Sequence, residues 1–319
     1  MISRPPITYE KWGKCGKYFE WQDHHVFYQR GGNGEVLLTI HGFPTCGWDW
    51  CWISPSLVKN FHTIVPDLLD YGRTLNSLRK PCSIMDQADM LEALMADRGI
   101  DEVHILAHDV GDTVAQELIA RHNESSLSFR IRSALFLNGG MLPSEHRPRK
   151  VQKLLAGPFG PLISHLSGKS KMLRGFTEVF GPNTKPTGIS LDEFWPAMVG
   201  VNGRSALARR IRYMAERVEH ADRWVGALKE AKIPMMLING VEDPVSGAHA
   251  ADAFEKTLPH VKVVRLPGIG HFPQIEAPET IAELVDQFHE CIVRNGYLKP
   301  TELKEAPGAQ MLGHRTLLA

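Results

Sequence analysis

The chain has 319 residues, and its 36 Lys and Arg residues are balanced by 36 Asp and Glu residues, so no net field favours nucleic acid or an anionic membrane as a partner. The five cysteines are scattered without a Cys-x-x-Cys pair, which argues against disulfides and a thiolate metal site and suits a reducing compartment. We find no apolar leader and no run of about 18 apolar residues, and we expect a cytoplasmic protein.

Short β-rich runs alternate with helical patterns along the first part of the chain. Ser83 is a good N-cap for the helix expected at residues 84–98, and Gly99 ends it. The alternation is typical of a mostly parallel sheet covered by helices on both faces. The expected strands span residues 17–20, 25–30, 36–40, 63–66, 103–107 and 133–137. The expected helices span residues 47–59, 84–98 and 110–121.

The pattern changes after residue 140. From residue 141 to about 232 no strand is evident, and the segment is rich in Pro, Gly, basic and aromatic residues. Strands then return at 234–239 and 261–266, followed by a helix at 278–293. We therefore expect a core formed by residues 1–140 and 233–319, a helical cap at 141–232, and a C-terminal tail from about residue 298.

A chemical motif, Ala107-His-Asp-Val-Gly111, lies at a predicted strand-to-helix junction. A nucleophile elbow needs a sharp turn at such a junction, with small residues that let strand and helix approach closely. The residue at its apex is Asp109, and the chain contains no Gly-x-Ser-x-Gly. The alternative is that Asp109 merely caps the following helix, which Asp does well.

Three further motifs favour catalysis. His41-Gly-Phe-Pro44 follows an apolar strand, so the backbone N–H groups of Phe43 and Val110 are the expected oxyanion donors. His271 follows the last predicted strand on a Gly-rich loop, where it can accept a proton from water. Asp243 ends the preceding strand and can orient that imidazole, although its neighbour Glu242 competes for this role. The order nucleophile, acid, histidine is the one that such an elbow requires.

With these motifs the sequence resembles the α/β-hydrolases that use an aspartate nucleophile, the epoxide hydrolases and haloalkane dehalogenases. The resemblance spans about residues 28–293 and implies a mostly parallel eight-stranded sheet with an inserted helical cap. Within this group the chain most resembles the mesoderm-specific transcript-like branch. Stretches that carry this likeness include Ser83-Ile-Met-Asp-Gln-Ala88, residues 108–117, His146-Arg-Pro148 and Arg223-Trp-Val-Gly-Ala-Leu228.

The resemblance also indicates which of the two reactions, dehalogenation or epoxide hydrolysis, is favoured. Dehalogenases of this group place halide donors such as Trp after the nucleophile, whereas Val110 stands here. Epoxide hydrolases donate a proton from cap tyrosines, and Tyr213 looks like the second of that pair in a Tyr-Met-x-x-Arg context. The first cap tyrosine has no counterpart, and His165 is the expected substitute. The alternative for Tyr213 is a residue that packs on the core.

We therefore expect a hydrolase that forms an alkyl ester on Asp109, most specifically an epoxide hydrolase. The alternatives are a dehalogenase with halide donors from the cap, such as Trp195 or Trp224, an ester or lactone hydrolase, and a non-catalytic member of the fold. The expected substrate is a small, apolar or weakly polar electrophile that reacts with water, without metal or cofactor. Candidate substrate-binding residues are His41, Trp48 and Trp195. The oligomeric state is left open.

Overall fold

The structure is a computed structural model that describes residue 2, residues 4–166 and residues 168–295. Its centre is one sheet in the order β1-β2-β4-β3-β6-β7-β8-β9, and the short β5 pairs with β2. The pairs β1–β2, β2–β4 and β2–β5 are antiparallel, and all other pairs are parallel. The strands are β1 Lys17–Trp21, β2 His24–Gly31, β3 Glu35–Ile40, β4 Phe61–Pro66, β5 Leu75–Asn76, β6 Glu102–His108, β7 Arg130–Leu137, β8 Met235–Gly240 and β9 Lys262–Leu266.

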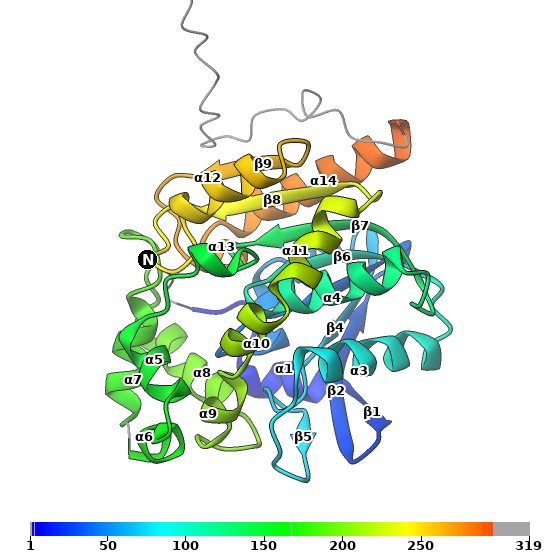
Figure 1. Cartoon of the computed structure of the whole chain (residues 1–319). Helices are drawn as coiled ribbons and strands as arrows, with labels where there is room; N and C mark the ends of the chain where they lie inside the picture. Colours follow the sequence, from blue (N-terminus) through cyan, green and yellow to red (C-terminus); the bar gives the residue numbers. More distant parts are fainter. Residues whose placement is uncertain (1, 3, 167, 296–319) are drawn as a thin grey trace, which may run out of the picture.

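Helices cover both faces of this sheet (Figure 1). Before β8 the core helices are α1 Tyr9–Cys15, η1 Gly47–Trp52, α2 Ser54–Leu57, α3 Ile84–Asp97 and α4 Val110–Asn123. After β8 they are α12 Ala248–Thr257, α13 Pro273–Glu276 and α14 Pro278–Asn295. The expected α/β-hydrolase architecture is thereby confirmed, with β5 added to the eight expected strands.

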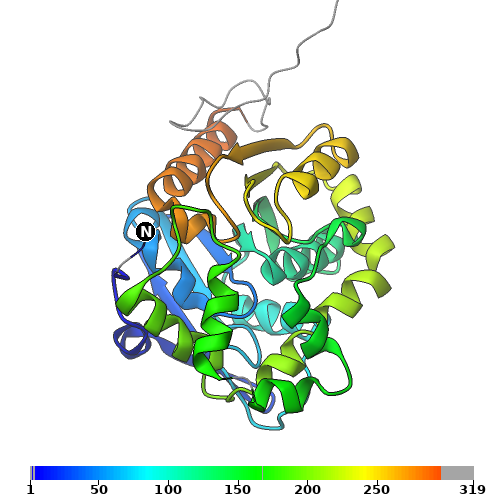
Figure 2. The ribbon, with the colours of Figure 1, turned by 90° about the vertical axis from the view of Figure 1, so that its left-hand side faces the viewer.

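The described residues between β7 and β8 form helices and no strand. These helices are η2 Pro143–Glu145, α5 Lys150–Ala156, α6 Gly160–Leu166, α7 Lys169–Thr177, α8 Gly188–Val199, α9 Ala206–Arg210, α10 Tyr213–Glu219 and α11 Ala221–Glu230. Figures 1 and 2 show α5–α9 as one layer beside the core. The expected cap limits, 141 and 232, fall in the connections that flank these helices. The expected tail from residue 298 lies outside the described residues.

Two apolar clusters, one on each face of the sheet, hold these layers together. In β6 the side chains alternate between them: Ile105 and Ala107 lie in the cluster with α3, α4 and α11, whereas Leu106 lies in the cluster with η1 and α14. This alternation follows from the two-residue period of a strand. Because β3, β6, β7, β8 and β9 are parallel, the loops that follow them meet at one edge of the sheet.

Two local expectations were wrong. The helix expected at 47–59 is divided into the 3-10 helix η1 and the short α2, because Pro55, at the start of α2, has no N–H to continue the preceding turn. The helix α1 was not anticipated, although Thr8 caps it by accepting the N–H of Lys11. The expected capping of α3 by Ser83 is confirmed, and Asp86 completes a reciprocal capping box.

Close approach of β3 to α4 requires a glycine at position 111. A Cβ added there would lie 2.1 Å from the carbonyl oxygen of Ile40, a backbone atom that cannot move aside. Gly111→Ala should therefore destabilise the protein by about 1–3 kcal/mol in urea unfolding. Gly226→Ala in α11 is the matched control because a Cβ there meets nothing within 4 Å. We expect it to be neutral or to stabilise by about 0.5–1 kcal/mol. Equal effects of the two substitutions would contradict this packing argument.

Candidate active site

Asp109 lies at the sharp turn between β6 and α4. Its backbone adopts φ 50° and ψ −104°, a conformation that a non-glycine residue rarely adopts and that surrounding structure must enforce. The Asp109 side chain makes no capping hydrogen bond to α4. The helix-cap interpretation is therefore wrong, and the turn instead projects the carboxylate away from the helix axis.

The Asp109 carboxylate is buried and held from three sides. The backbone N–H of Phe43 donates to Oδ2 over 3.0 Å, and Nη2 of Arg217 lies 3.3 Å from Oδ1. Nε2 of His271 is 3.9 Å from Oδ2. Burial favours the neutral acid, but the charges of Arg217 and His271 outweigh it and hold the pKa of Asp109 below its usual value. The carboxylate is thus ionised at neutral pH.

Arg217, on the cap helix α10, contacts Asp109 directly and was not among the residues selected from the sequence. Its side chain is buried, and it donates to the Asp109 carbonyl (2.8 Å) and, through Nε, to the Thr113 hydroxyl (2.7 Å). The guanidinium also stacks on the ring of Tyr213, 4.6 Å from its centroid. The signal was present in the Tyr-Met-x-x-Arg context, in which residues four apart share a helix face.

Asp243 and His271 form the expected acid–histidine pair. Nδ1 of His271 lies 2.8 Å from Oδ2 of Asp243. Asp243 also accepts hydrogen bonds from Val245 N, the Ser246 hydroxyl and the Asn138 amide. These contacts fix the carboxylate, which fixes the imidazole with Nε2 toward Asp109.

The charge on His271 depends on both carboxylates. Burial disfavours the imidazolium, but the charges of Asp243 and Asp109 and the Asp243 hydrogen bond raise the pKa of His271 to about 9. In the free protein at neutral pH the imidazole is therefore protonated. Loss of the charge on Asp109 would remove one of the interactions that raise this pKa.

Glu276 and His108 hold the loop that carries His271. The carboxylate of Glu276 accepts the N–H groups of Gly270 (2.8 Å), Phe272 (2.9 Å) and the cap residue Gly181 (2.9 Å). His108 has a lowered pKa, about 3, chiefly through burial, so it is neutral, and its Nε2 lies 2.7 Å from the His271 carbonyl oxygen. Both residues position the His271 imidazole, and neither was selected from the sequence.

Phe43 and Val110 lie on the two segments that flank Asp109. The N–H of Phe43 already binds Oδ2, and Val110 begins α4 directly after Asp109. His41 plays a different role from the expected one. Its Nε2 accepts the N–H of Leu68 over 2.9 Å, and its Nδ1 lies 3.0 Å from the Gly42 oxygen. Both ring nitrogens of His41 thus have protein partners, and the residue anchors the Phe43 loop.

The cap brings Tyr213 to the site, as expected, but not His165. Tyr213 is buried, and its ring lies 6.0 Å from that of Phe43. The side-chain amide of Gln152 on α5 donates a hydrogen bond to the Tyr213 hydroxyl over 3.4 Å. This amide is therefore the polar group that the structure places beside the Tyr213 hydroxyl, where a second proton donor was expected. His165 is exposed on α6, whereas the Asp109 carboxylate is buried, so the structure does not bring these two side chains together. Tyr213 and Val110 also line a small cavity with Leu69, Tyr71, Ile84, Gln87 and Arg210.

The tryptophans proposed to bind substrate take part in packing instead. Trp48 is fully buried, contacts Phe194 edge-on at 5.1 Å and donates its indole N–H to the Ile7 carbonyl. Trp195 is partly buried against the same apolar cluster. An indole in a sequence is equally suited to a cleft and to a core, so the aromatic pattern alone did not separate the two.

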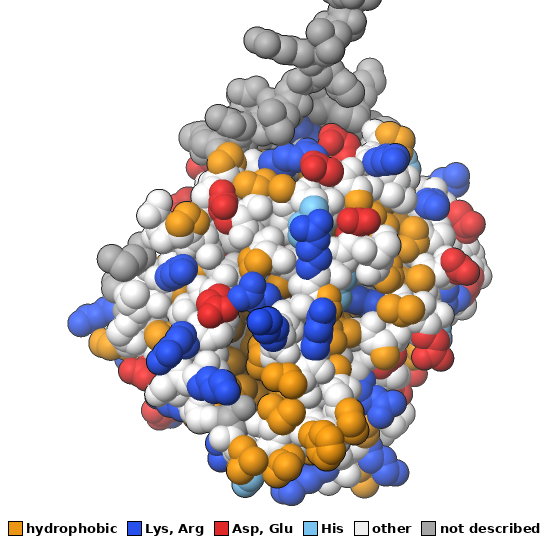
Figure 3. Space-filling model, turned by 60° about the vertical axis from the view of Figure 1, so that its left-hand side comes forward, with side chains coloured by type: hydrophobic (Ala, Val, Ile, Leu, Met, Phe, Trp, Pro, Cys, Tyr) orange, Lys and Arg blue, Asp and Glu red, His pale blue; other side chains and the backbone are white. Residues whose placement is uncertain are grey.

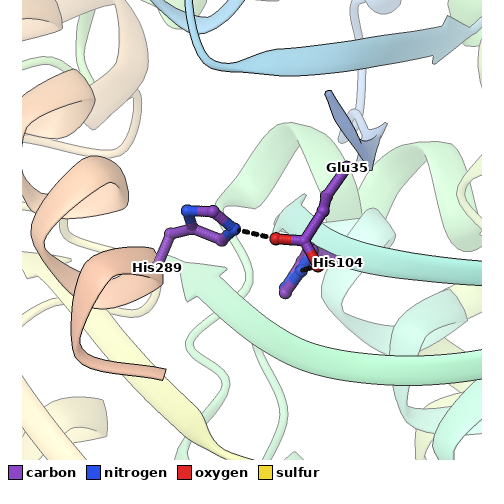
Figure 4. Close-up of side chains that lie close together, drawn as sticks. All are labelled: Glu35, His104 and His289. Carbon is purple, nitrogen blue, oxygen red and sulfur yellow. Dashed lines mark hydrogen bonds and ion pairs between the residues drawn. The ribbon is translucent and has the colours of Figure 1, made fainter. Parts of the chain in front are cut away.

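In the described part of the chain, one group of side chains could hold a metal ion. It consists of Glu35, His104 and His289, whose ligand atoms lie within 4.8 Å of one another (Figure 4). Glu35 begins β3, whereas Asp109 follows the carboxyl end of the neighbouring β6. The group therefore lies at the opposite end of the sheet from Asp109, and the chemistry of the carboxylate site does not involve it.

A buried carboxylate at a strand–helix elbow, followed along the chain by an acid and a histidine on later strand ends, is an arrangement typical of α/β-hydrolases. The family model for the alpha/beta hydrolase fold matches residues 35–278, and the chain belongs to this family. It is 36% identical over 279 residues to the mesoderm-specific transcript homolog protein of Bos taurus, covering 84% of this chain and 83% of that protein. The resemblance to this branch is confirmed.

Two other similarities are more limited. A soluble epoxide hydrolase of Corynebacterium sp. is 32% identical over 95 residues, which cover 29% of this chain and 32% of that protein. The crystal structure of a haloalkane dehalogenase from Bradyrhizobium elkani matches with a TM-score of 0.71 and 22% identity, covering 86% of this chain and 99% of that one. The structural likeness establishes the common fold.

The pairing of Arg217 with Asp109 can be measured by a double-mutant cycle. Arg217→Gln leaves a buried carboxylate without its cation and should destabilise the protein by about 3–5 kcal/mol. In an Asp109→Asn background the same change should cost at least about 1 kcal/mol less, as measured by urea unfolding. Arg209→Gln is the control because Arg209 pairs with Asp70. Its effect should add to that of Asp109→Asn within about 0.5 kcal/mol. Equal coupling for the two arginines would contradict the assignment.

The raised pKa of His271 predicts a specific pH dependence of stability. The folded protein, with a His271 pKa of about 9, binds this proton more tightly than the unfolded chain, whose histidines titrate near ~6.5. The resulting stabilisation is complete below about pH 6.5 and is lost as the pH rises through 9. The free energy of unfolding of wild type minus that of His271→Gln should therefore fall by about 3 kcal/mol between these limits. A difference that does not vary with pH would refute the raised pKa.

Proposed function

We propose that this α/β-hydrolase acts through a covalent ester on Asp109 and opens epoxides to diols. The observation that carries the proposal is the ionised, buried carboxylate of Asp109, held at the elbow within 3.9 Å of the His271 imidazole. A carboxylate is suited to attack on a saturated carbon, where it displaces an oxygen. From an ester carbonyl it would form an anhydride, which is a less useful intermediate. This chemistry favours epoxides over esters.

In the first step, Oδ1 of Asp109 attacks a ring carbon while Oδ2 stays against the N–H of Phe43. Oδ1 is assigned as nucleophile because its contact with Arg217, at 3.3 Å, is longer than the 3.0 Å hydrogen bond that holds Oδ2. The carbon–oxygen bond of the ring breaks, and the alkoxide takes the hydroxyl proton of Tyr213. Burial and the charge of Asp109 raise the pKa of Tyr213, and ester formation removes that charge. The phenol therefore becomes a better acid as the ester forms.

The second step hydrolyses the ester. Once Asp109 is neutral, the pKa of His271 falls, so the imidazolium can lose its proton to the Tyr213 phenolate through water and become a base. Nε2 of His271 then takes a proton from a water whose oxygen attacks the ester carbon of Asp109. The N–H groups of Phe43 and Val110 hold the resulting oxyanion.

Collapse of this intermediate expels the product oxygen, which receives the proton from His271. The restored carboxylic acid of Asp109 ionises, and its proton returns to the imidazole. The sum is epoxide plus water giving a diol, with every side chain returned to its starting state. No electron is transferred in any step, so the sequence of reactions requires no redox partner.

The alternative functions have less support from the site. Dehalogenation would need halide donors from the cap, but the indole N–H of Trp224 is used in a 2.9 Å hydrogen bond to Glu117. Trp195 packs in an apolar cluster. A non-catalytic role would not explain why Asp109 is held as a buried charge in a strained backbone conformation. Hydrolysis of strained lactones is the remaining alternative, since the same oxyanion contacts would serve it.

Intact mass of the His271→Ala protein provides the direct test. This variant should form the Asp109 ester but fail to hydrolyse it, because no base activates water. Incubation with epoxides should add the mass of the whole epoxide, whereas a haloalkane would add only its alkyl group. The adduct should be absent from an Asp109→Ala, His271→Ala variant. In a Tyr213→Phe, His271→Ala variant it should form about 100-fold more slowly.

His165→Ala is the matched control, since His165 is an exposed cap histidine. It should accumulate no adduct and should turn over substrate like the wild type. An alkyl-only gain in the His271→Ala variant would identify a dehalogenase. A stable adduct that survives Asp109→Ala would show that another residue is the nucleophile.

A further inference from the structure

The cap helices α5 and α6 and the short connection between them expose a set of large apolar side chains. Of the twelve large hydrophobic residues exposed in the described part of the chain, five lie within residues 151–166. We call these five the apolar face: Val151, Leu154, Phe159, Leu162 and Leu166, exposed by 42%, 56%, 69%, 56% and 71%. Figure 3 shows apolar side chains gathered on the cap side of the molecule, with basic side chains beside them.

The apolar face is not a poorly packed part of the core. On the same helix α5, Leu155 is buried in the core and Gln152 reaches the Tyr213 hydroxyl. The helix therefore already has an inward side, and Leu154 is an additional apolar residue on its outward side, with the partly exposed Val151 at the boundary between the two sides. An exposed cluster of this kind on a soluble fold marks an interaction surface.

The charge of the surrounding segment identifies the partner. Residues 146–177 contain seven Lys and Arg residues and no Asp or Glu, in a chain whose total charge is balanced. Arg149 is paired with Glu178, and Lys169 with Asp192. The other five basic residues are exposed: Arg147, Lys150, Lys153, Lys171 and Arg174. Exposed apolar side chains bordered by unneutralised cations are the chemistry that recognises an anionic lipid surface.

The geometry fits a helix pair that lies on a bilayer. In the part of the chain that the structure describes, no helix is long and apolar enough to cross a membrane. The helices α5 and α6 have seven residues each, and their apolar side chains could enter only the region between headgroups and acyl chains. The basic residues would then lie at the level of the phosphates.

We propose that the apolar face of α5 and α6 docks this protein on anionic lipid membranes. Docking places the outward side of α5 against the lipid, while Gln152 on its inward side stays with Tyr213. The active site would thus lie one helix away from a phase in which apolar substrates concentrate. The proposal rests on surface chemistry alone, and its test is independent of any catalytic activity.

Co-sedimentation of the full chain with vesicles tests this proposal. We expect binding to phosphatidylcholine vesicles that contain about 30% phosphatidylserine, little binding to pure phosphatidylcholine, and loss of binding as salt rises well above ~0.1 M. Leu154→Ser, Phe159→Ser should weaken the partition coefficient at least about tenfold by removing apolar insertion. Lys150→Gln, Lys153→Gln should weaken it roughly tenfold by removing charge.

Matched controls change the same residue types elsewhere. Leu78→Ser, Val218→Ser removes two apolar side chains that are exposed by 51% and 68% outside the apolar face. Lys229→Gln, Lys256→Gln removes two exposed lysines outside residues 146–177. Both control variants should bind vesicles like the wild type. All of the substituted side chains are exposed, and circular dichroism would verify that each variant is folded.

Three outcomes would overturn the proposal. One is wild-type binding to anionic vesicles no greater than that of the apolar-face variant. Another is an equal loss of binding in the control variants, which would indicate non-specific adsorption. The third is a wild-type dimer in light scattering that Leu154→Ser, Phe159→Ser dissociates, without vesicle binding. That result would assign the apolar face to a contact between copies of the chain.

Discussion

The negative charge of Asp109, buried at the turn between β6 and α4, is the constraint on which the active site depends. An isolated buried carboxylate would take up a proton, so the fold must supply compensating groups around it. It does so with the N–H of Phe43, the guanidinium of Arg217 and the imidazolium of His271. The loop that carries Phe43, the cap and the loop that carries His271 are therefore brought together by one requirement, the stabilisation of this buried charge.

This requirement also links the ionisation states of the site. The charge of Asp109 raises the pKa of both His271 and Tyr213, so both hold their protons while the Asp109 carboxylate is ionised. Asp243 orients the imidazole, and Glu276 and His108 fix its loop. The hydrolase fold is established by family membership and architecture. The ester mechanism and the epoxide substrate are inferred from this coupling of charges.

Elements defined by local patterns could be predicted from the sequence. The sheet, the elbow and the acid–histidine pair follow from alternation, small residues at a junction and the order of motifs along the chain. Contacts between distant segments could not: Arg217 reaches Asp109 only after the cap folds over the sheet, and Glu276 binds three separate N–H groups. The exposure of His165 on α6 and the burial of Trp48 in the core could not be predicted from the sequence either. The total charge of the chain is balanced, and this total does not reveal that residues 146–177 contain no Asp or Glu.

The ion pair between Arg217 and Asp109 links the charge of Asp109 to the contact between the cap and the sheet. Arg217 belongs to α10 in the cap, whereas Asp109 belongs to the sheet, so their attraction acts as a latch between two layers. In the proposed mechanism, esterification would neutralise one side of this ion pair, and hydrolysis would restore it. In a turnover that passes through the Asp109 ester, the grip of the cap on the sheet is weakest while product is still attached and strongest when the site is ready for the next substrate.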